Sequence, residues 1–139
     1  MTRPRSALLA VTIAAFLSAG AAAAQGVKKA PPKGDYKKVS SLVALPDFIP
    51  GLGTLYVKPD TLPAGPFLAY DRQGNLVSTI YMIPVKDLEA RKAFANLATS
   101  GERVDHVTIE FNAGHPGVEE PHYHVILWHV SPQRAAALK

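Results

Sequence analysis

Two apolar segments, Phe67-Leu-Ala-Tyr70 and Leu76-Val-Ser-Thr-Ile-Tyr-Met-Ile83, lie on either side of the short polar sequence Asp71-Arg-Gln-Gly-Asn75. A five-residue loop that contains Gly and Asn between two apolar segments is typical of a β-hairpin. The second segment is rich in β-branched and aromatic residues, which favour the packed environment of a strand. We therefore expect these two segments to pair as antiparallel strands.

Short apolar segments bounded by turn signals also lie on both sides of this hairpin. They predict four further strands, at residues 42–45, 54–58, 104–111 and 122–130. The chain contains no internal repeat, so these strands are expected to belong to one antiparallel arrangement.

The sequence after Pro84 has a different pattern. Residues 85–98 consist largely of good helix formers. Within them Ala90, Phe94 and Leu97 have the spacing of one stripe along a helix. The pattern predicts one main helix around residues 85–98.

The end of the chain favours a second, shorter helix. Ser131 and Pro132 are residue types preferred at an N-cap and at the first helical position. Taken together, the elements predict an α+β fold that is mostly antiparallel β, with a barrel-like or curved sheet and one main helix.

The first 24 residues resemble a secretory signal peptide. Arg3 and Arg5 precede an apolar segment at 7–17, which is followed by small residues up to Ala24. This order is typical of a signal peptide, and the apolar segment is shorter than the roughly 20 residues of a membrane-spanning helix. We expect cleavage between Ala24 and Gln25, a periplasmic or secreted protein, and no stable membrane insertion afterwards.

Residues 25–40 are expected to be a flexible basic linker, and residues 41–139 a single globular β-rich domain. The linker sequence contains five lysines and the extended sequence Ala30-Pro-Pro-Lys-Gly34. From Ser41 onward, eight basic residues face ten acidic ones. A basic tail with a single aromatic residue, Tyr36, gives no support for nucleic-acid binding.

The chain of 139 residues contains no cysteine. This excludes disulfides, thiolate metal ligands and a thiol nucleophile. A domain of this size without disulfides has a small core, so burial in a homo-oligomer is a reasonable expectation.

The five histidines lie close together in the sequence, between positions 106 and 129. His122 and His124 alternate along a predicted strand, so their side chains share one face. His115 precedes them in a predicted loop that could fold back over the strand. If Glu110 on the preceding strand lies opposite His124, its carboxylate joins that face, whereas a shift of one residue would place Ile109 or Phe111 there.

Imidazole nitrogens at this spacing can converge on one divalent transition metal, such as Zn, Cu, Ni or Fe. The candidate metal ligands are therefore His115, His122 and His124, with Glu110 as a further candidate. The leading hypothesis is a small module that binds such a metal or a small ligand. The alternative is a non-catalytic structural or assembly domain whose histidines serve packing and hydrogen bonding.

Gly117 followed by His122-Tyr-His124 resembles the cupin motif, in which a Gly precedes His-x-His on a strand. Residues 125–128 supply neither the Glu nor the Gly expected after it. This partial resemblance implies a cupin-like metal-dependent enzyme as a third hypothesis.

Residues 105–131 more closely resemble a small secreted bacterial domain family of unknown function. That family has a Gly-His-Pro-Pro loop, then Pro-His-Phe-Asp and His-Phe-Tyr segments. His115 and His122 match its loop and strand histidines, whereas His124 replaces its Asp and Ile126 its second strand histidine. The resemblance implies a β-rich domain that can be oligomeric, without an established activity.

Overall fold

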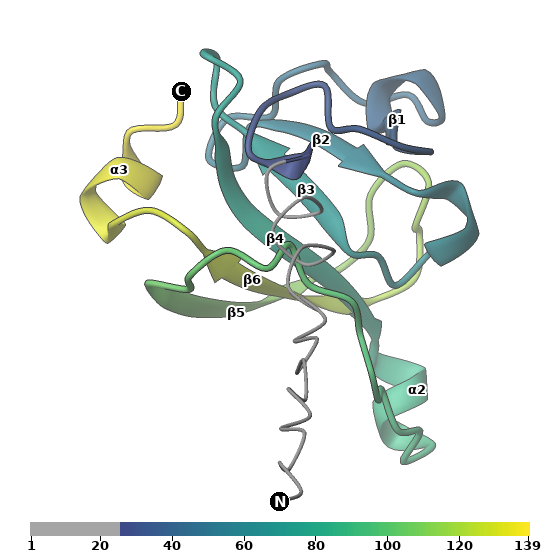
Figure 1. The fold of residues 1–139 in the computed structure, drawn as a ribbon. Helices are drawn as coiled ribbons and strands as arrows, with labels where there is room; N and C mark the ends of the chain where they lie inside the picture. The colour runs from purple at the N-terminus through teal and green to yellow at the C-terminus, as the bar shows by residue number, and fades with distance from the viewer. Residues whose placement is uncertain (1–25) are drawn as a thin grey trace, which may run out of the picture.

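The predicted hairpin forms the centre of the sheet in the computed structural model, which describes residues 26–139. Strands β3 (Phe67–Tyr70) and β4 (Leu76–Pro84) pair antiparallel, and every residue in both strands is buried. The other strands are β1 (Lys37–Lys38), β2 (Thr54–Val57), β5 (His106–Asn112) and β6 (His122–Trp128). Their order in the sheet is β1-β2-β3-β4-β6-β5, and all pairs are antiparallel (Figure 1). The predicted signal peptide at residues 1–24 lies outside the described residues.

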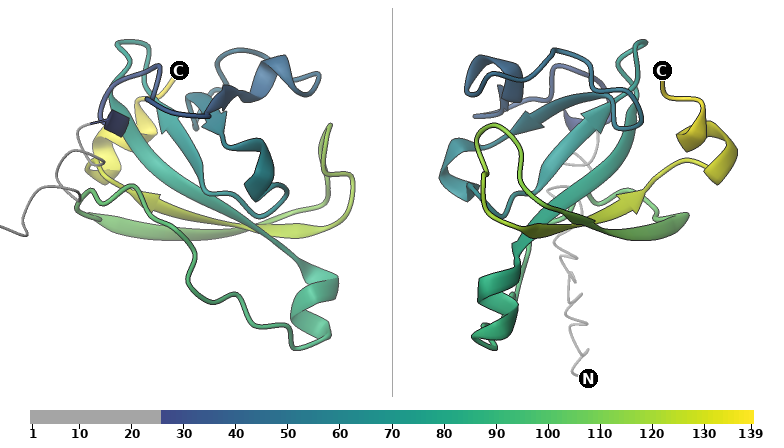
Figure 2. Two further views of the ribbon diagram at one scale, coloured as in Figure 1. Left: turned by 45° about the vertical axis from the view of Figure 1, so that its right-hand side comes forward. Right: turned by 180° about the vertical axis from the view of Figure 1, so that it is seen from behind.

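The sheet is twisted and curved, and it is open (Figure 2). Within residues 26–139, the outer strands β1 and β5 do not pair with each other, so the barrel-like alternative is wrong and the curved-sheet alternative is confirmed. Because the sheet is curved, side chains on one face of β2, β3, β4 and β6 converge on a single apolar core. Its members include Val57, Phe67, Ile80 and Ile126.

The expected main helix at 85–98 is wrong. The helix α2 comprises only Val85–Glu89, and Arg91 and Asn96 have positive φ angles of 56° and 58°. None of the five residues of α2 is buried. A helix this short has little intrinsic stability, and without an apolar face against the core nothing extends it. Residues 90–104 instead form an irregular connection to β5.

The strand predicted at 42–45 is also wrong. A 3₁₀ turn, η1 (Val39–Ser41), precedes it, and the amide groups of Leu42 and Val43 both donate to the carbonyl of Val39. A second such turn, η2 (Pro59–Thr61), follows β2. The apolar side chains of Val43 and Leu45 still pack against the core, which accounts for the apolar pattern.

Residues 26–40, expected as a flexible linker, instead lie against the sheet. Val27 and Val39 are buried, Lys37 and Lys38 form β1, and the Tyr70 hydroxyl donates to the carbonyl of Val27 at 2.7 Å. Apolar residues that lie among the lysines, such as Val27 and Val39, make the contacts with the sheet, and a count of charges does not reveal them.

The short C-terminal helix is confirmed as α3 (Pro132–Ala136). The Ser131 hydroxyl accepts a hydrogen bond from the Arg134 amide, as expected of an N-cap. No helix within residues 26–139 has the length and apolar character needed to cross a membrane.

Candidate metal centre

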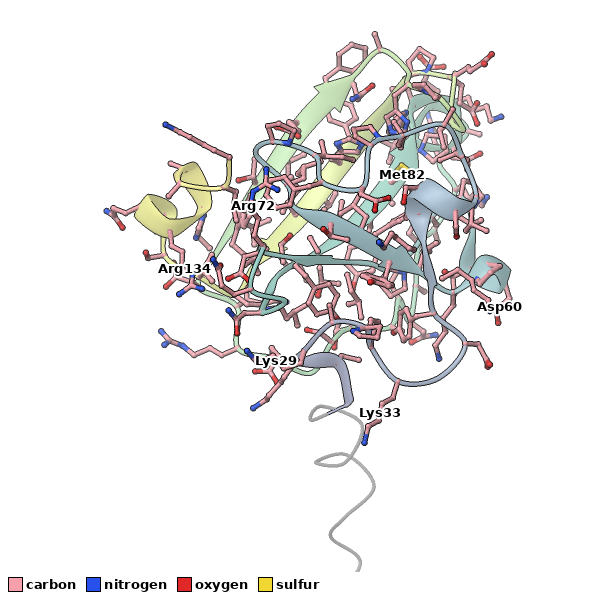
Figure 3. The ribbon with its side chains drawn as sticks, turned by 90° about the horizontal axis from the view of Figure 1, so that it is seen from above. Lys29, Lys33, Asp60, Arg72, Met82 and Arg134 are labelled. Carbon is pink, nitrogen blue, oxygen red and sulfur yellow. The ribbon has the colours of Figure 1, made fainter. Side chains whose placement is uncertain are left out.

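Strands β5 and β6 pair in the register that brings Glu110 to the histidines. Glu110 lies opposite His124, and Asn112 lies opposite His122. On β4, Met82, which is labelled in Figure 3, is the register partner of His124. His122 and His124 are buried at 0% and 6% exposure, because the β4–β6 pairing places them on the face that the core covers.

The loop between β5 and β6 carries His115 back over this face. The amide of His115 donates to the carbonyl of Val118 at 2.9 Å, and Val118 returns the bond at 2.9 Å, which closes a tight turn through Pro116 and Gly117. Proline followed by a positive-φ glycine, here at 90°, is the sequence of a type II turn.

Two close approaches require glycine in this loop. A Cβ on Gly114 would collide with the carbonyl oxygen of Glu119, and a Cβ on Gly117 would lie 2.7 Å from a methyl group of Val43. The loop thus packs directly on the segment after η1, and both views in Figure 2 show it folded toward that side of the sheet.

The result is a cluster of three imidazole rings, those of His115, His122 and His124. One ring nitrogen from each lies within 4.8 Å of the others. The Nε2 atoms of His122 and His124 are 3.1 Å apart, and the centroids of the His115 and His122 rings are 4.9 Å apart.

On each ring, Nδ1 faces an oxygen atom outside the cluster. His122 Nδ1 lies 2.7 Å from the carbonyl oxygen of Glu120, and His115 Nδ1 lies 3.1 Å from that of Pro116. His124 Nδ1 lies 3.5 Å from Glu110 Oε1. Metal-binding histidines commonly donate their other N–H to a carbonyl or carboxylate, which leaves Nε2 as the ligand.

The electrostatics around His124 favour a neutral imidazole ring. Burial lowers the pKa of His124 below its ordinary value of 6.5, and the nearby His122 and His115 rings lower it further. Glu110 opposes this shift without overcoming it. A neutral ring is the form that coordinates a metal.

The spacing is close to that of a tetrahedral ion. With bonds of about 2.0–2.1 Å, two nitrogens on one tetrahedral zinc are about 3.3 Å apart. The His122–His124 pair already meets this spacing at 3.1 Å. The half-buried His115 lies on the loop with one ring nitrogen within 4.8 Å of those of the pair, so a triad of imidazoles is geometrically possible for a metal.

The structure brings together three of the four residues predicted as ligands. Glu110 is not one of the three; its side chain is 51% exposed and lies beside His124. The remaining histidines lie elsewhere: the His106 ring stacks on Trp128, and His129 bonds to Thr79, Ser100 and the Arg103 carbonyl.

The sequence did not predict a cavity that lies beside the histidine cluster. It has a volume of about 300 Å³, and its wall includes Val43, Leu55, Phe67, Ile80 and Met82. His115 and His124 also lie on this wall. The residues that line it come from segments far apart in the chain, so local sequence does not reveal the cavity. The one sequence feature that pointed to it was the apolar segment at 42–52, which packs on the core without forming a strand.

Comparisons with known proteins agree with a family without a described activity. A family model described as "TTHB210-like: Hypothetical protein TTHB210" matches residues 71–111. The crystal structure of the hypothetical protein TTHB210 from Thermus thermophilus is similar to this chain, with 49% sequence identity and a TM-score of 0.62. That match covers 68% of this chain and 92% of the other. None of the curated proteins matches.

These matches test the two family resemblances seen in the sequence, to a small secreted bacterial family and to the cupins. The expectation of a small uncharacterised family is confirmed. The family-model match ends at Phe111 and does not reach the loop and strand motifs around His115 and His122. The resemblance in those motifs therefore stays a prediction. The open six-stranded sheet also differs from the eight-stranded double sheet of cupins, so the fold does not support the cupin-like hypothesis. Because TTHB210 is 49% identical to this chain and is covered over 92% of its length, the chain belongs to the TTHB210-like family.

Proposed function

We propose that this protein is a periplasmic or secreted module that binds one divalent transition metal through His115, His122 and His124. Nε2 of each ring is the proposed ligand atom, and Glu110 orients His124. The localisation rests on the signal-peptide pattern of residues 1–24.

The observation that supports this proposal most strongly is a conflict among the protons of the two buried rings. His122 uses its Nδ1 proton on the Glu120 carbonyl, so its Nε2 carries a lone pair. A neutral His124 has one proton, which can lie toward Glu110 or toward His122 but not both.

Either position leaves an unfavourable contact. With the proton on Nδ1, two nitrogen lone pairs face each other at 3.1 Å; with it on Nε2, a lone pair faces the Glu110 carboxylate. Buried polar atoms without a favourable partner are costly. A cation between the Nε2 atoms removes the conflict, because both lone pairs then bind it and both Nδ1 protons keep their acceptors.

Zinc is the first candidate. Three imidazoles with an open fourth position are typical of zinc, and also suit Cu(II), Ni and Fe(II). The chain contains no cysteine, so a thiolate site for Cu(I) is excluded.

The test is elemental analysis of untagged protein purified without chelators. We expect about one equivalent of a single transition metal, which is absent from the His122→Ala/His124→Ala double variant. His129→Ala is the matched control: it removes a histidine with three hydrogen-bonding contacts outside the cluster, so it should lower the melting temperature but retain the metal. No metal in the purified protein, together with no thermal shift on adding zinc, copper or nickel, would contradict the proposal.

A second candidate function is assembly with further copies of this chain. It is favoured by the exposed apolar face of the edge strand β5, where Val107, Ile109 and Phe111 are 51%, 66% and 57% exposed. An exposed apolar strand at a sheet edge is a site that proteins usually cover. The two candidates are compatible, because this face and the histidine cluster lie on opposite faces of the sheet.

A further inference from the structure

The cavity of about 300 Å³ lies between the sheet and the segment after η1, and the loop carrying His115 forms part of its wall. Apolar side chains make up nearly all of its wall. Within residues 26–139, no Lys, Arg, Asp or Glu lines it. A volume of this size is at the lower end of the range of small-molecule sites.

Three residues with polar side chains line the cavity: Asn112, His115 and His124. Asn112 Oδ1 accepts a hydrogen bond from the Gly114 amide, so its carbonyl oxygen is already used to hold the loop. The polar part of the cavity therefore coincides with the histidine cluster.

Two of the three proposed metal ligands, His115 and His124, line the cavity, whereas His122 does not. An ion held by all three would therefore have its open coordination position on the cavity side. A molecule with a metal-binding head and an apolar body could use both features at once.

We infer that the cavity binds an aliphatic monocarboxylate of medium length, with its carboxylate on the metal and its chain among the aliphatic side chains. This inference rests on the proposed metal site. The metal is the cation that a buried carboxylate needs, because no lysine or arginine lines the wall. At about 30 Å³ for a group the size of water, the cavity holds on the order of ten such groups, which favours octanoate over long-chain acids.

The chain length should therefore control affinity. Each methylene buried contributes about 0.8 kcal/mol, or roughly a fourfold change in Kd. Octanoate is then expected to bind at least a hundredfold more tightly than butanoate, and the gain should end when the chain exceeds the cavity.

The experiment is calorimetric titration of the zinc-loaded and metal-free protein with octanoate, and of both forms with 1-octanol. We expect octanoate to bind the zinc form at least tenfold more tightly than the metal-free form, and to lose more affinity than octanol when zinc is removed. Equal octanoate affinity in both forms would overturn the inference while leaving the metal site intact. So would the absence of octanoate binding in protein shown by elemental analysis to hold zinc.

A matched pair of variants distinguishes octanoate binding in the cavity from zinc binding at the histidines. Leu62 lines the cavity and is 45% exposed, whereas Leu88 lies on α2, away from it, and is 47% exposed. Leu62→Trp should block octanoate and keep zinc affinity, whereas Leu88→Trp should change neither. If Leu62→Trp leaves octanoate binding unchanged, the cavity is not the site. If zinc does not bind at all, the metal proposal fails. Binding of octanol to that same protein would then show that the cavity is purely apolar, and this result would also overturn the carboxylate inference.

Discussion

Glu110 lies directly opposite His124 in the β5–β6 pair, with its Oε1 atom 3.5 Å from the Nδ1 atom of the buried ring. Carboxylates placed this way orient a metal-binding imidazole, and their loss typically weakens metal binding by 10- to 100-fold. Glu110→Gln should therefore lower zinc affinity by about that factor, and His124→Ala should lower it further. Competition titration with a chelator of known affinity measures both.

Glu119→Gln is the control for this substitution. Glu119 is an exposed carboxylate of the neighbouring loop, so it tests whether loss of negative charge near the site suffices. Equal weakening in both variants would show a general electrostatic effect and contradict the orienting role of Glu110.

Of the six strands in the described residues, the sequence predicted all but β1, whereas the main helix at 85–98 and the strand at 42–45 were wrong, for a physical reason. The loop at residues 71–75 and the apolar, β-branched content of its flanks place β3 and the start of β4, in which every residue is buried. Alternation is visible in β6, where buried and half-buried residues follow one another. The stripe at Ala90, Phe94 and Leu97 had no core to face, and the chain leaves the helix after Glu89. Local pattern alone cannot indicate whether a partner surface exists.

The sequence predicted that the three histidines lie close together, but it could not predict the strand register beside them. The period of two put His122 and His124 on one face. Whether Glu110 or a neighbouring apolar residue faced them depended on pairing across the sheet, which local sequence does not encode. The cavity depended on where the apolar segment after η1 packs, and this is set by contacts with residues far along the chain.

The loop that carries His115 should be sensitive to one methyl group. Gly114→Ala adds a Cβ at a φ of 127°, where it collides with the Glu119 carbonyl oxygen, so the backbone must move and His115 with it. We expect the free energy of unfolding to fall by more than the roughly 1–2 kcal/mol that a left-handed conformation costs an L-residue. Zinc affinity should fall as well.

Gly51→Ala isolates the conformational cost. Gly51 has a φ of 83° and open space around the added Cβ. Denaturant unfolding should show a smaller loss for Gly51→Ala, with zinc affinity unchanged. If the two alanine variants bind zinc equally well, the position of His115 does not depend on this turn.

The exposed face of β5 should mediate self-association. Ile109 is 66% exposed at the middle of the edge strand, and a lysine there would place a charge in any interface formed on this face. Ile109→Lys should reduce the molar mass measured by light scattering during size-exclusion chromatography. Leu88→Lys, at an exposed leucine of α2, should not; equal masses for Ile109→Lys and wild type would exclude this face as the interface.

Asp71 should make folding stability depend on pH at the acid end. Its side chain is 6% exposed; it accepts bonds from Asn75 and Gln73 in the hairpin and from Arg134 of α3, which is labelled in Figure 3. Burial alone would raise the pKa of Asp71, but these bonds together hold the pKa below its ordinary value of 3.8. Since the unfolded chain then binds the proton more readily, the stabilisation is complete above pH 3.8 and is lost as the pH falls below it.

Asp71→Asn removes the charge and keeps the shape, so the variant should lose about 1–3 kcal/mol of unfolding free energy at neutral pH. Denaturant titrations across the acid range should show the difference from wild type shrinking as the pH falls from 3.8 through the lowered pKa of Asp71, below which both side chains are neutral. Asp35→Asn, at an exposed position, should show no such difference at either pH. A gap between Asp71→Asn and wild type that stays constant throughout the acid range would mean that the lost stability comes from geometry, with no contribution from the ion pair to Arg134.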